Sequence, residues 1–218
     1  MARKTVSTAA PFVPPAATST QLWEAAQECK GCDLYRNATQ AVLGEGPATA
    51  RIVMIGEQPG DQEDRAGRPF VGPAGRLLDR ALEDAGIARS DLYITNAVKH
   101  FKFEMRGKRR IHKKPGEIEI VACRPWLAAE LSIVRPEVIV CLGATAARAV
   151  IGKEHRIERD RGKFFSHPWA RTVTATVHPS AVLRAQDDEA RHKAYRAFVQ
   201  DLKAVRRKLE TTARRGAA

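Results

Sequence analysis

The chain has 218 residues, a formal net charge of +12 at pH 7 and a sequence pI near 10.0. Its length favours one domain of ordinary size, and 44% hydrophobic with 28% charged residues is typical of a globular protein, which excludes disordered and fibrous classes. No segment approaches the roughly 18 uninterrupted apolar residues of a membrane span. The positive charge suits a polyanionic partner such as nucleic acid, but equally a basic protein that binds none.

The two ends of the chain differ in composition from the rest. Residues 1–19 are predicted to form a flexible tail, because Pro11, Pro14 and Pro15 lie among small residues that cannot build a core. This tail lacks the apolar segment of a secretory signal, so we expect a cytoplasmic protein without a membrane partner. A single domain is predicted for residues 20–209, followed by a flexible basic C-terminus over residues 210–218.

Strand-like and helix-like segments alternate along the domain. A first helix is predicted to begin at Thr20, as its cap, and to run toward Cys29. Short apolar runs predict four buried strands, at 51–56, 92–95, 137–142 and 172–177. Helices are predicted between and after them, at 74–85, at 117–134 with an interruption at Pro125, from about 145, and at 189–209. The alternation predicts an α/β fold: a three-layer α/β/α sandwich around a mostly parallel four-stranded sheet.

Polar motifs follow three of the predicted strands. They are Gly56–Gly60 (Gly-Glu-Gln-Pro-Gly), Asn96–His100 and His178–Ser180. Ligands of parallel sheets bind at the carboxyl ends of the strands, so the motifs predict a site at this edge. The first motif lacks the Gly-Lys-Ser/Thr of a phosphate-binding P-loop. Each motif alone also has an ordinary structural explanation, as a turn or a structural histidine.

A basic segment extends from the second motif. Residues 99–114 contain eight lysines or arginines and one acid, Glu104, so the local net charge is +7. Phe101, Phe103 and His112 are interleaved with the charges, a pattern that suits a phosphate backbone with exposed bases. Phe70, in a glycine-rich loop, either stacks on a planar ligand or anchors that loop. The segment predicts a nucleic-acid-binding loop beside the site.

Four cysteines are present, and two of them form a Cys-x-x-Cys pair, Cys29 and Cys32. Without an export signal such a pair is typical of metal or redox sites. Cys141 lies within a continuous apolar strand and is expected to behave as a small apolar residue, whereas Cys123 is a possible ligand. The residues alone leave zinc and iron–sulfur open.

The order of the motifs resembles the iron–sulfur branch of the uracil-DNA glycosylase superfamily over roughly residues 20–205. The shared motifs are Cys-x-x-Cys, Gly-Glu-x-Pro-Gly, Arg-Pro-Phe-Val-Gly, Asn-x-Val-Lys, Leu-Gly-Ala-Thr-Ala and His-Pro-Ser. Gly56–Gly60 and the insertion Lys108–His112 look like the X-type members, UdgX, which excise uracil and stay covalently bonded to abasic DNA. The alternatives are a conventional turnover iron–sulfur glycosylase and a non-catalytic single-strand or lesion binder.

This resemblance implies a cofactor and a partner. The cofactor is a [4Fe-4S] cluster bound by Cys29, Cys32, His100 and Cys123, in which His100 stands where related enzymes carry a cysteine. Cys141 is not among the implied ligands. The partner is uracil-containing DNA, with single strands favoured and duplexes reached by base flipping, and we expect a monomer.

The resemblance also implies roles for individual residues. His112 would attack C1′ of the deoxyribose, Glu57 would stabilise the cationic sugar or deprotonate the attacking group, and His178 would stabilise the leaving base near uracil O2. Uracil would be bound by Gly56, Gln58, Phe70, Asn96 and His178. DNA would be contacted by Lys108, Arg109, Arg110 and Ser180.

Overall fold

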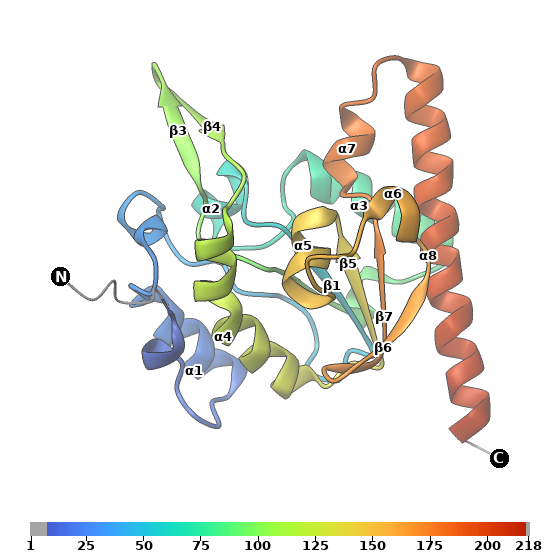
Figure 1. Ribbon diagram of the computed structural model, residues 1–218, viewed down its shortest axis with the longest axis horizontal. Helices are drawn as coiled ribbons and strands as arrows, with labels where there is room; N and C mark the ends of the chain where they lie inside the picture. Colours follow the sequence, from blue (N-terminus) through green and yellow to red (C-terminus); the bar gives the residue numbers. More distant parts are fainter. Residues whose placement is uncertain (1–7, 217–218) are drawn as a thin grey trace.

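A computed structural model describes residues 8–216 and contains a five-stranded sheet of order β2-β1-β5-β7-β6 (Figure 1). The strands are β1 (Ile52–Gly56), β2 (Leu92–Asn96), β5 (Val138–Leu142), β6 (Phe164–His167) and β7 (Ala170–Thr176). The four predicted strands are the parallel ones, which confirms the fold class. The predicted strand number is wrong by one, because β6 is a short, partly exposed, antiparallel edge strand with an irregular register and no continuous apolar run.

Helices cover both faces of the sheet, as predicted. The longer ones are α1 (Ser19–Gln27), α3 (Pro73–Ala85), α4 (Glu117–Val134) and α8 (Asp188–Gly216); the shorter ones are α2 (Asp61–Ala66), α5 (Ala144–Val150), α6 (Ile157–Asp160) and α7 (Pro179–Leu183). Short 3-10 turns occupy Ala10–Phe12, Asp33–Arg36 and Arg89–Asp91. In the described residues no helix has both the length and the apolar character to cross a membrane.

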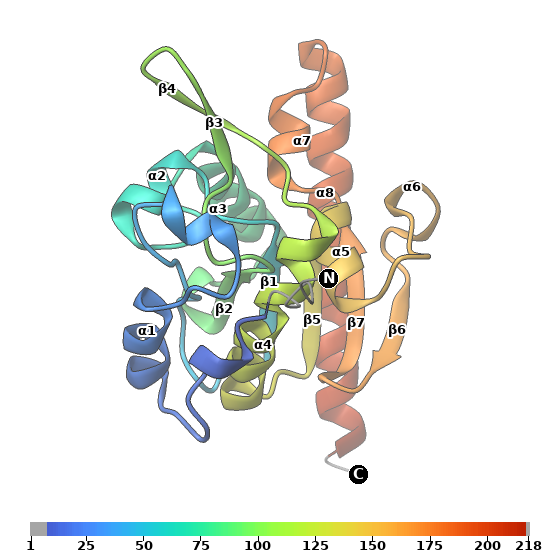
Figure 2. The same cartoon turned by 60° about the vertical axis from the view of Figure 1, so that its left-hand side comes forward.

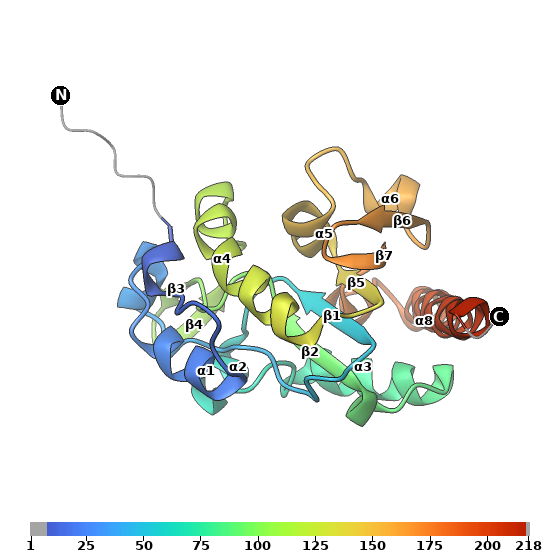
Figure 3. The same cartoon turned by 90° about the horizontal axis from the view of Figure 1, so that it is seen from below.

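The two cores follow from the alternation of side chains along each strand. Val53 and Ile55 of β1 point to the core beneath α1, α4 and α5, whereas Ile52 and Met54 point to the core beneath α3, α7 and α8. Figure 3 shows these two helical layers on either side of the sheet. The carboxyl ends of β1 and β2, at Gly56 and Asn96, lie side by side at one edge of the sheet.

Several helix ends differ from the prediction. α1 begins two residues earlier, with Thr18 in place of Thr20 as its cap, because Thr18 and Gln21 form a reciprocal capping box in which each side chain accepts a backbone N–H of the other. α4 continues through Pro125, where the buried side chains of Trp126 and Leu127 hold the helix against the sheet. α8 extends past the predicted end at Leu209 to Gly216.

The chain ends are more structured than predicted where they are described. Ala9 is buried and its N–H donates to the carbonyl of Ala122 at 2.8 Å, so part of the predicted tail packs on α4. Pro11 lies within the short turn Ala10–Phe12, and its fixed φ favours that turn. Residues 1–7 and 217–218 of the predicted tails lie outside the described residues.

The basic segment forms a β-hairpin where a loop was predicted. Its strands are β3 (Phe103–Arg106) and β4 (Arg109–His112), and the hairpin projects from the molecule (Figures 1 and 2). Gly107 in the turn has φ +58°, a conformation that favours glycine. Phe103 lies opposite His112 and Met105 lies opposite Arg110, so these four side chains share one face of the hairpin.

Candidate active site

Gly56 lies at the carboxyl end of β1 and lets two other side chains approach its backbone. A Cβ at this position would lie 2.4 Å from Oδ1 of Asn96 and 2.6 Å from Cζ of Phe70. Asn96 ends the neighbouring strand β2 and is 2% exposed, and none of the described residues hydrogen-bonds to its side-chain amide. The amide therefore offers two donors and an acceptor to a ligand.

Phe70 is held in an unusual backbone conformation next to Gly56. Its φ is +56°, in the left-handed region, which costs a residue with a Cβ about 1–2 kcal/mol. Its buried ring lies with its centroid 5.9 Å from that of His178. Such strain persists where the surrounding structure imposes it, and it is frequent at binding sites.

His178 is the N-cap residue of α7. Its Nδ1 accepts the backbone N–H of Ser180 at 3.1 Å and lies 2.8 Å from the Ser180 hydroxyl. Burial lowers the pKa of His178 to about 4, despite the opposing charge of Glu57, so the ring is neutral at pH 7. With Nδ1 accepting a backbone N–H, the ring proton is on Nε2, which is a donor for a ligand. Ser180, a predicted DNA contact, orients this ring.

Glu57 and His112 lie close together although they belong to different parts of the chain: Glu57 follows β1, and His112 is the last residue of β4. Nε2 of His112 lies 3.3 Å from Oε1 of Glu57, whose carboxylate also accepts a hydrogen bond from the Thr145 hydroxyl on α5. Burial alone would raise the pKa of Glu57, but the bonds to His112 and Thr145 lower it below its ordinary value. Glu57 is therefore a carboxylate at neutral pH, next to an imidazole whose side chain is 49% exposed.

The contacts of Gln58 differ from its predicted role in binding uracil. Its Nε2 donates to the carbonyls of Lys102 at 3.1 Å and Lys113 at 3.0 Å, and its Oε1 accepts the N–H of Lys102 at 3.2 Å. These residues flank the two ends of the hairpin. Because its side-chain amide is engaged in these bonds, Gln58 acts here as a clasp that holds the hairpin against the loop after β1.

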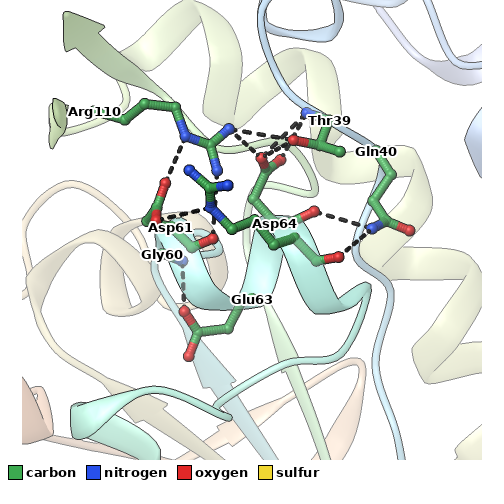
Figure 4. Close-up of polar contacts among 8 residues, drawn as sticks. Thr39, Gln40, Gly60, Asp61, Glu63, Asp64 and Arg110 are labelled. Atoms are coloured by element: carbon green, nitrogen blue, oxygen red, sulfur yellow. Dashed lines mark hydrogen bonds and ion pairs between the residues drawn. The ribbon is translucent and has the colours of Figure 1, made fainter. Parts of the chain in front are cut away.

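Arg110 also differs from the prediction, which placed it on DNA phosphates. Its Nε lies 2.5 Å from Oδ1 of Asp61 and its Nη1 lies 2.6 Å from Oδ2 of Asp64, both on α2 (Figure 4). The guanidinium also lies over the rings of Phe101 and Phe103, 5.4 and 5.0 Å from their centroids. Only 12% of the side chain is exposed. Arg110 turns inward because two carboxylates and two rings face it, and it anchors the hairpin to α2.

The rest of the basic segment is also largely paired. Five of its eight basic residues form ion pairs with acids; they are Lys99, Lys102, Arg106, Arg110 and Lys113. Lys108, Arg109 and Lys114 have no acidic partner among the described residues, and all three are exposed. The local charge of +7 therefore overstates what the hairpin presents to solvent. Lys108 and Arg109, at its tip, remain predicted DNA contacts.

The four implied cluster ligands are drawn from three segments. Cys29 and Cys123 are buried, Cys32 is partly buried, and the Cys123 thiol interacts electrostatically with both of the others. Burial raises the pKa of Cys123 to about 12. Two N–H groups point at sulfur: Lys99 N lies 3.2 Å from Cys123 Sγ, and Trp126 Nε1 lies 3.1 Å from Cys29 Sγ.

His100 follows Lys99 directly and is 5% exposed. Burial lowers its pKa to about 4, so its imidazole is neutral, the form that binds metals. In the described part of the chain no three His, Cys, Asp or Glu side chains lie close enough together to hold a single metal ion. Thiols with N–H donors to sulfur, beside a neutral imidazole, fit an iron–sulfur cluster, whose several irons hold their ligands farther apart.

Cys141 lies apart from this group. It is fully buried in β5, and burial is the one cause of its raised pKa, with no thiol neighbour contributing. It therefore behaves as the apolar residue that the sequence predicts.

Three residues of this site were missed from the sequence: Asp61 and Asp64, which hold Arg110, and Thr145, which holds Glu57. The spacing of the two acids, three residues apart near the start of a helix, is a weak signal that they share a face. Thr145 lay within a recognised motif, but its hydroxyl had no partner that the sequence could name.

Comparison with known proteins identifies the family. Residues 43–203 match the model of the uracil DNA glycosylase superfamily. The chain is 41% identical over 169 residues to the Type-4 uracil-DNA glycosylase of Thermotoga maritima, covering 77% of this chain and 84% of that protein. It is 40% identical over 162 residues to the Type-4 uracil-DNA glycosylase of Archaeoglobus fulgidus, covering 71% and 78%, and 36% identical over 165 residues to that of Saccharolobus solfataricus, covering 72% and 73%. The chain belongs to the uracil-DNA glycosylase superfamily.

Proposed function

We propose that the protein is an iron–sulfur uracil-DNA glycosylase of the X type, which excises uracil from DNA and is then trapped through His112 on C1′ of the abasic site. Uracil excision is supported by the similarity to Type-4 uracil-DNA glycosylases, at 41% and 40% identity over most of the chain. The observation that carries the covalent step is the 3.3 Å approach of His112 Nε2 to the Glu57 carboxylate beside Asn96 and Phe70.

Recognition of uracil would use groups that the protein leaves free. A base reached by flipping, or in a single strand, stacks on the Phe70 ring next to the Gly56 backbone. The Asn96 amide has no hydrogen-bond partner among the described residues and matches the donors and acceptors of the uracil edge. His178 donates its Nε2 proton to uracil O2, where negative charge develops as the glycosidic bond breaks.

The bond changes balance without an external reactant. The C1′–N1 bond breaks and its electron pair leaves with uracil, stabilised by His178. A lone pair on Nδ1 of the His112 ring forms the new N–C1′ bond, and the proton on Nε2, which faces the Glu57 carboxylate, passes to that carboxylate. Since a carbon–nitrogen bond to imidazole has no easily expelled leaving group, each molecule acts once.

The hairpin contacts support this assignment of His112. Gln58 and Arg110 hold β3 and β4 so that the ring stays beside Glu57. In the alternative, a conventional turnover glycosylase, Glu57 would instead direct a water molecule to C1′. A fixed hairpin that holds the half-exposed imidazole of His112 next to Glu57 favours covalent attack by His112 over attack by water.

The cluster is proposed to be held by Cys29, Cys32, His100 and Cys123. When bound, the cluster would supply electron-transfer chemistry and a rigid link between the segments that carry its ligands. In this protein we assign it the second role, because its ligands join the segment after α1, the loop after β2, and α4.

The test is incubation of the protein with uracil-containing single-stranded DNA, followed by a denaturing gel. A heat-resistant, DNA-dependent upward shift is expected, with a thymine-containing strand of the same sequence as the control. Free uracil with an alkali-labile strand but no shift would replace the covalent proposal with turnover excision. Salt-sensitive binding without uracil release would identify a non-catalytic binder.

We also propose that residues 20–209 act as one domain, that the protein works as a monomer, and that single-stranded DNA is preferred to duplex DNA. Adduct rates on matched single and double strands, and the mass of the purified adduct, measure the last two directly.

A further inference from the structure

A fully buried ion pair lies behind the site and has no part in the chemistry described above. Nζ of Lys99 lies 2.5 Å from Oε2 of Glu130, and their side chains are 1% and 0% exposed. Lys99 follows β2, and Glu130 lies on α4. A buried ion pair is a poor source of stability, because desolvation offsets the attraction, so its position calls for another explanation.

Every polar group of the pair is used. The three ammonium hydrogens of Lys99 have three acceptors: Glu130, the Thr95 hydroxyl at 2.8 Å and the backbone carbonyl of Asn96 at 2.7 Å. Glu130 also accepts hydrogen bonds from the N–H of Gly44, the Tyr93 hydroxyl and the Thr95 hydroxyl. A buried network in which every member is satisfied is rigid and specifies one arrangement.

The bond from Lys99 to the carbonyl of Asn96 fixes the last peptide of β2. The next two N–H groups, of Ala97 and Val98, donate to the carbonyls of Gly56 and Glu57. The orientation of the Asn96 side chain depends on this backbone, because within residues 8–216 its amide has no hydrogen-bond partner of its own. The ammonium of Lys99 supplies the donor that this carbonyl uses at the end of the strand.

Lys99 also reaches the implied cluster through its own backbone. Its N–H donates to Cys123 Sγ at 3.2 Å, and its carbonyl accepts the N–H of Val42 at 2.8 Å. Glu130 and Cys123 lie on the same helix, α4, so one rigid element holds both the charge that fixes the ammonium and a proposed cluster ligand.

We propose that Lys99, held by Glu130, is a positioning residue that fixes Asn96 for uracil recognition and joins it to α4. This inference rests on the proposed uracil-excising function and deepens it: specificity for the base depends on an ion pair that never touches it. Asn96 is the recognising group, and Lys99 acts through its backbone carbonyl.

The test uses the cluster-loaded full chain with the double substitution Lys99→Met/Glu130→Gln. It removes both charges while the amide oxygen of the new side chain keeps an acceptor for Gly44, Tyr93 and Thr95. We expect an unchanged visible absorbance of the cluster and a release of uracil slowed about 10- to 100-fold, as small misplacements of a recognition group cause. Glu130→Gln alone keeps the shape of the side chain and one acceptor oxygen but sets an NH2 donor against the Lys99 ammonium, so a slower release of uracil is expected here too, and this variant serves if the double variant does not fold.

A mutant cycle separates positioning from general damage. If Lys99 acts through Asn96, the variant N96A/K99M/E130Q releases uracil within about threefold of N96A alone. Losses that multiply instead, or a double variant with the wild-type rate, would overturn the inference.

A second readout needs no activity. Hydrogen exchange of the peptide spanning residues 96–100 is expected to quicken about tenfold in the double variant, while the β5 peptide is unchanged. Unchanged exchange at 96–100 contradicts the inference whatever the enzyme does. A wild-type protein that releases no uracil contradicts the proposed function, and the exchange result then still decides the role of Lys99.

Discussion

His112 Nε2 approaches Glu57 Oε1 to 3.3 Å, which joins the last residue of the hairpin strand β4 to the loop after β1. If this imidazole is the nucleophile, His112→Ala abolishes the adduct, by at least about 100-fold, while uracil release continues with water in its place. Denaturing gels measure the adduct, and chromatography measures free uracil. Glu57→Gln is expected to slow both by about 100-fold, since the carboxylate serves either nucleophile. A His112→Ala protein that crosslinks normally would show that another residue attacks C1′.

His178 links the site to the stability of the fold at low pH. Its pKa is about 4 in the folded chain because of burial, against an ordinary value near 6.5. The unfolded chain binds this proton first as the pH falls, so unfolding becomes easier between pH 6.5 and 4. Between pH 7 and pH 5 we expect His178 to cost about 2 kcal/mol of unfolding free energy. Urea unfolding of wild type and His178→Asn at the two pH values measures it; an equal pH dependence would contradict a neutral, buried His178.

Gln58 is expected to govern how well the hairpin presents His112. Gln58→Ala removes three hydrogen bonds to Lys102 and Lys113, so adduct formation slows and unfolding free energy falls by about 1–3 kcal/mol. Gln40→Ala is the matched control, because its side-chain amide donates to two carbonyls, those of Asp64 and Arg65, without touching the hairpin. Equal adduct rates in the two variants would show that the clasp does not matter for the reaction.

Much of this fold was predictable because its signals are local. The strands β1 and β5 are short apolar runs buried on both faces, β2 and β7 are short buried segments that mix apolar residues with threonine, and the apolar face of α3 repeats at helical spacing. β6 and the hairpin were not predictable in this way. β6 is partly exposed and has an irregular register. The hairpin is held in place by Gln58, which lies outside it, and by the ion pairs of its own Arg110 with acids that are distant in the sequence.

The site was predictable in its members more than in their roles. Strand ends placed Gly56, Asn96 and His178 at one edge, because parallel strands end together. Charge counting did not foresee the ion pairs of Arg110, since a sequence does not reveal which cations turn inward to a buried carboxylate. The hydrogen bonds of Gln58 were also not foreseen, because its partners are backbone groups, which carry no sequence signal.

Arg110 and Arg109 are neighbours with opposite expected effects. Arg109→Gln is expected to weaken binding to single-stranded DNA and to reduce the log–log salt slope by about 0.7, as the loss of one phosphate contact does. Arg110→Gln is expected to leave that slope unchanged and to slow the adduct, because Asp61 and Asp64 lose the cation that anchors the hairpin. Binding titrations at several salt concentrations, with adduct rates alongside, separate the two. A changed salt slope in Arg110→Gln would restore its predicted contact with DNA.

Cys123 is a proposed cluster ligand, and Cys141 is a buried cysteine outside the proposed ligand set. Cys123→Ala is expected to lose the visible absorbance and bound iron, whereas Cys141→Ala keeps both, because its thiol lies in the core of β5 away from the others. His100→Cys is expected to retain the cluster at a lower reduction potential, since imidazole ligation raises the potential relative to thiolate. Iron analysis, absorbance and redox titration measure these effects without reference to uracil excision. A cluster that survives Cys123→Ala, or zinc in place of iron, would show that the ligand set is assigned incorrectly.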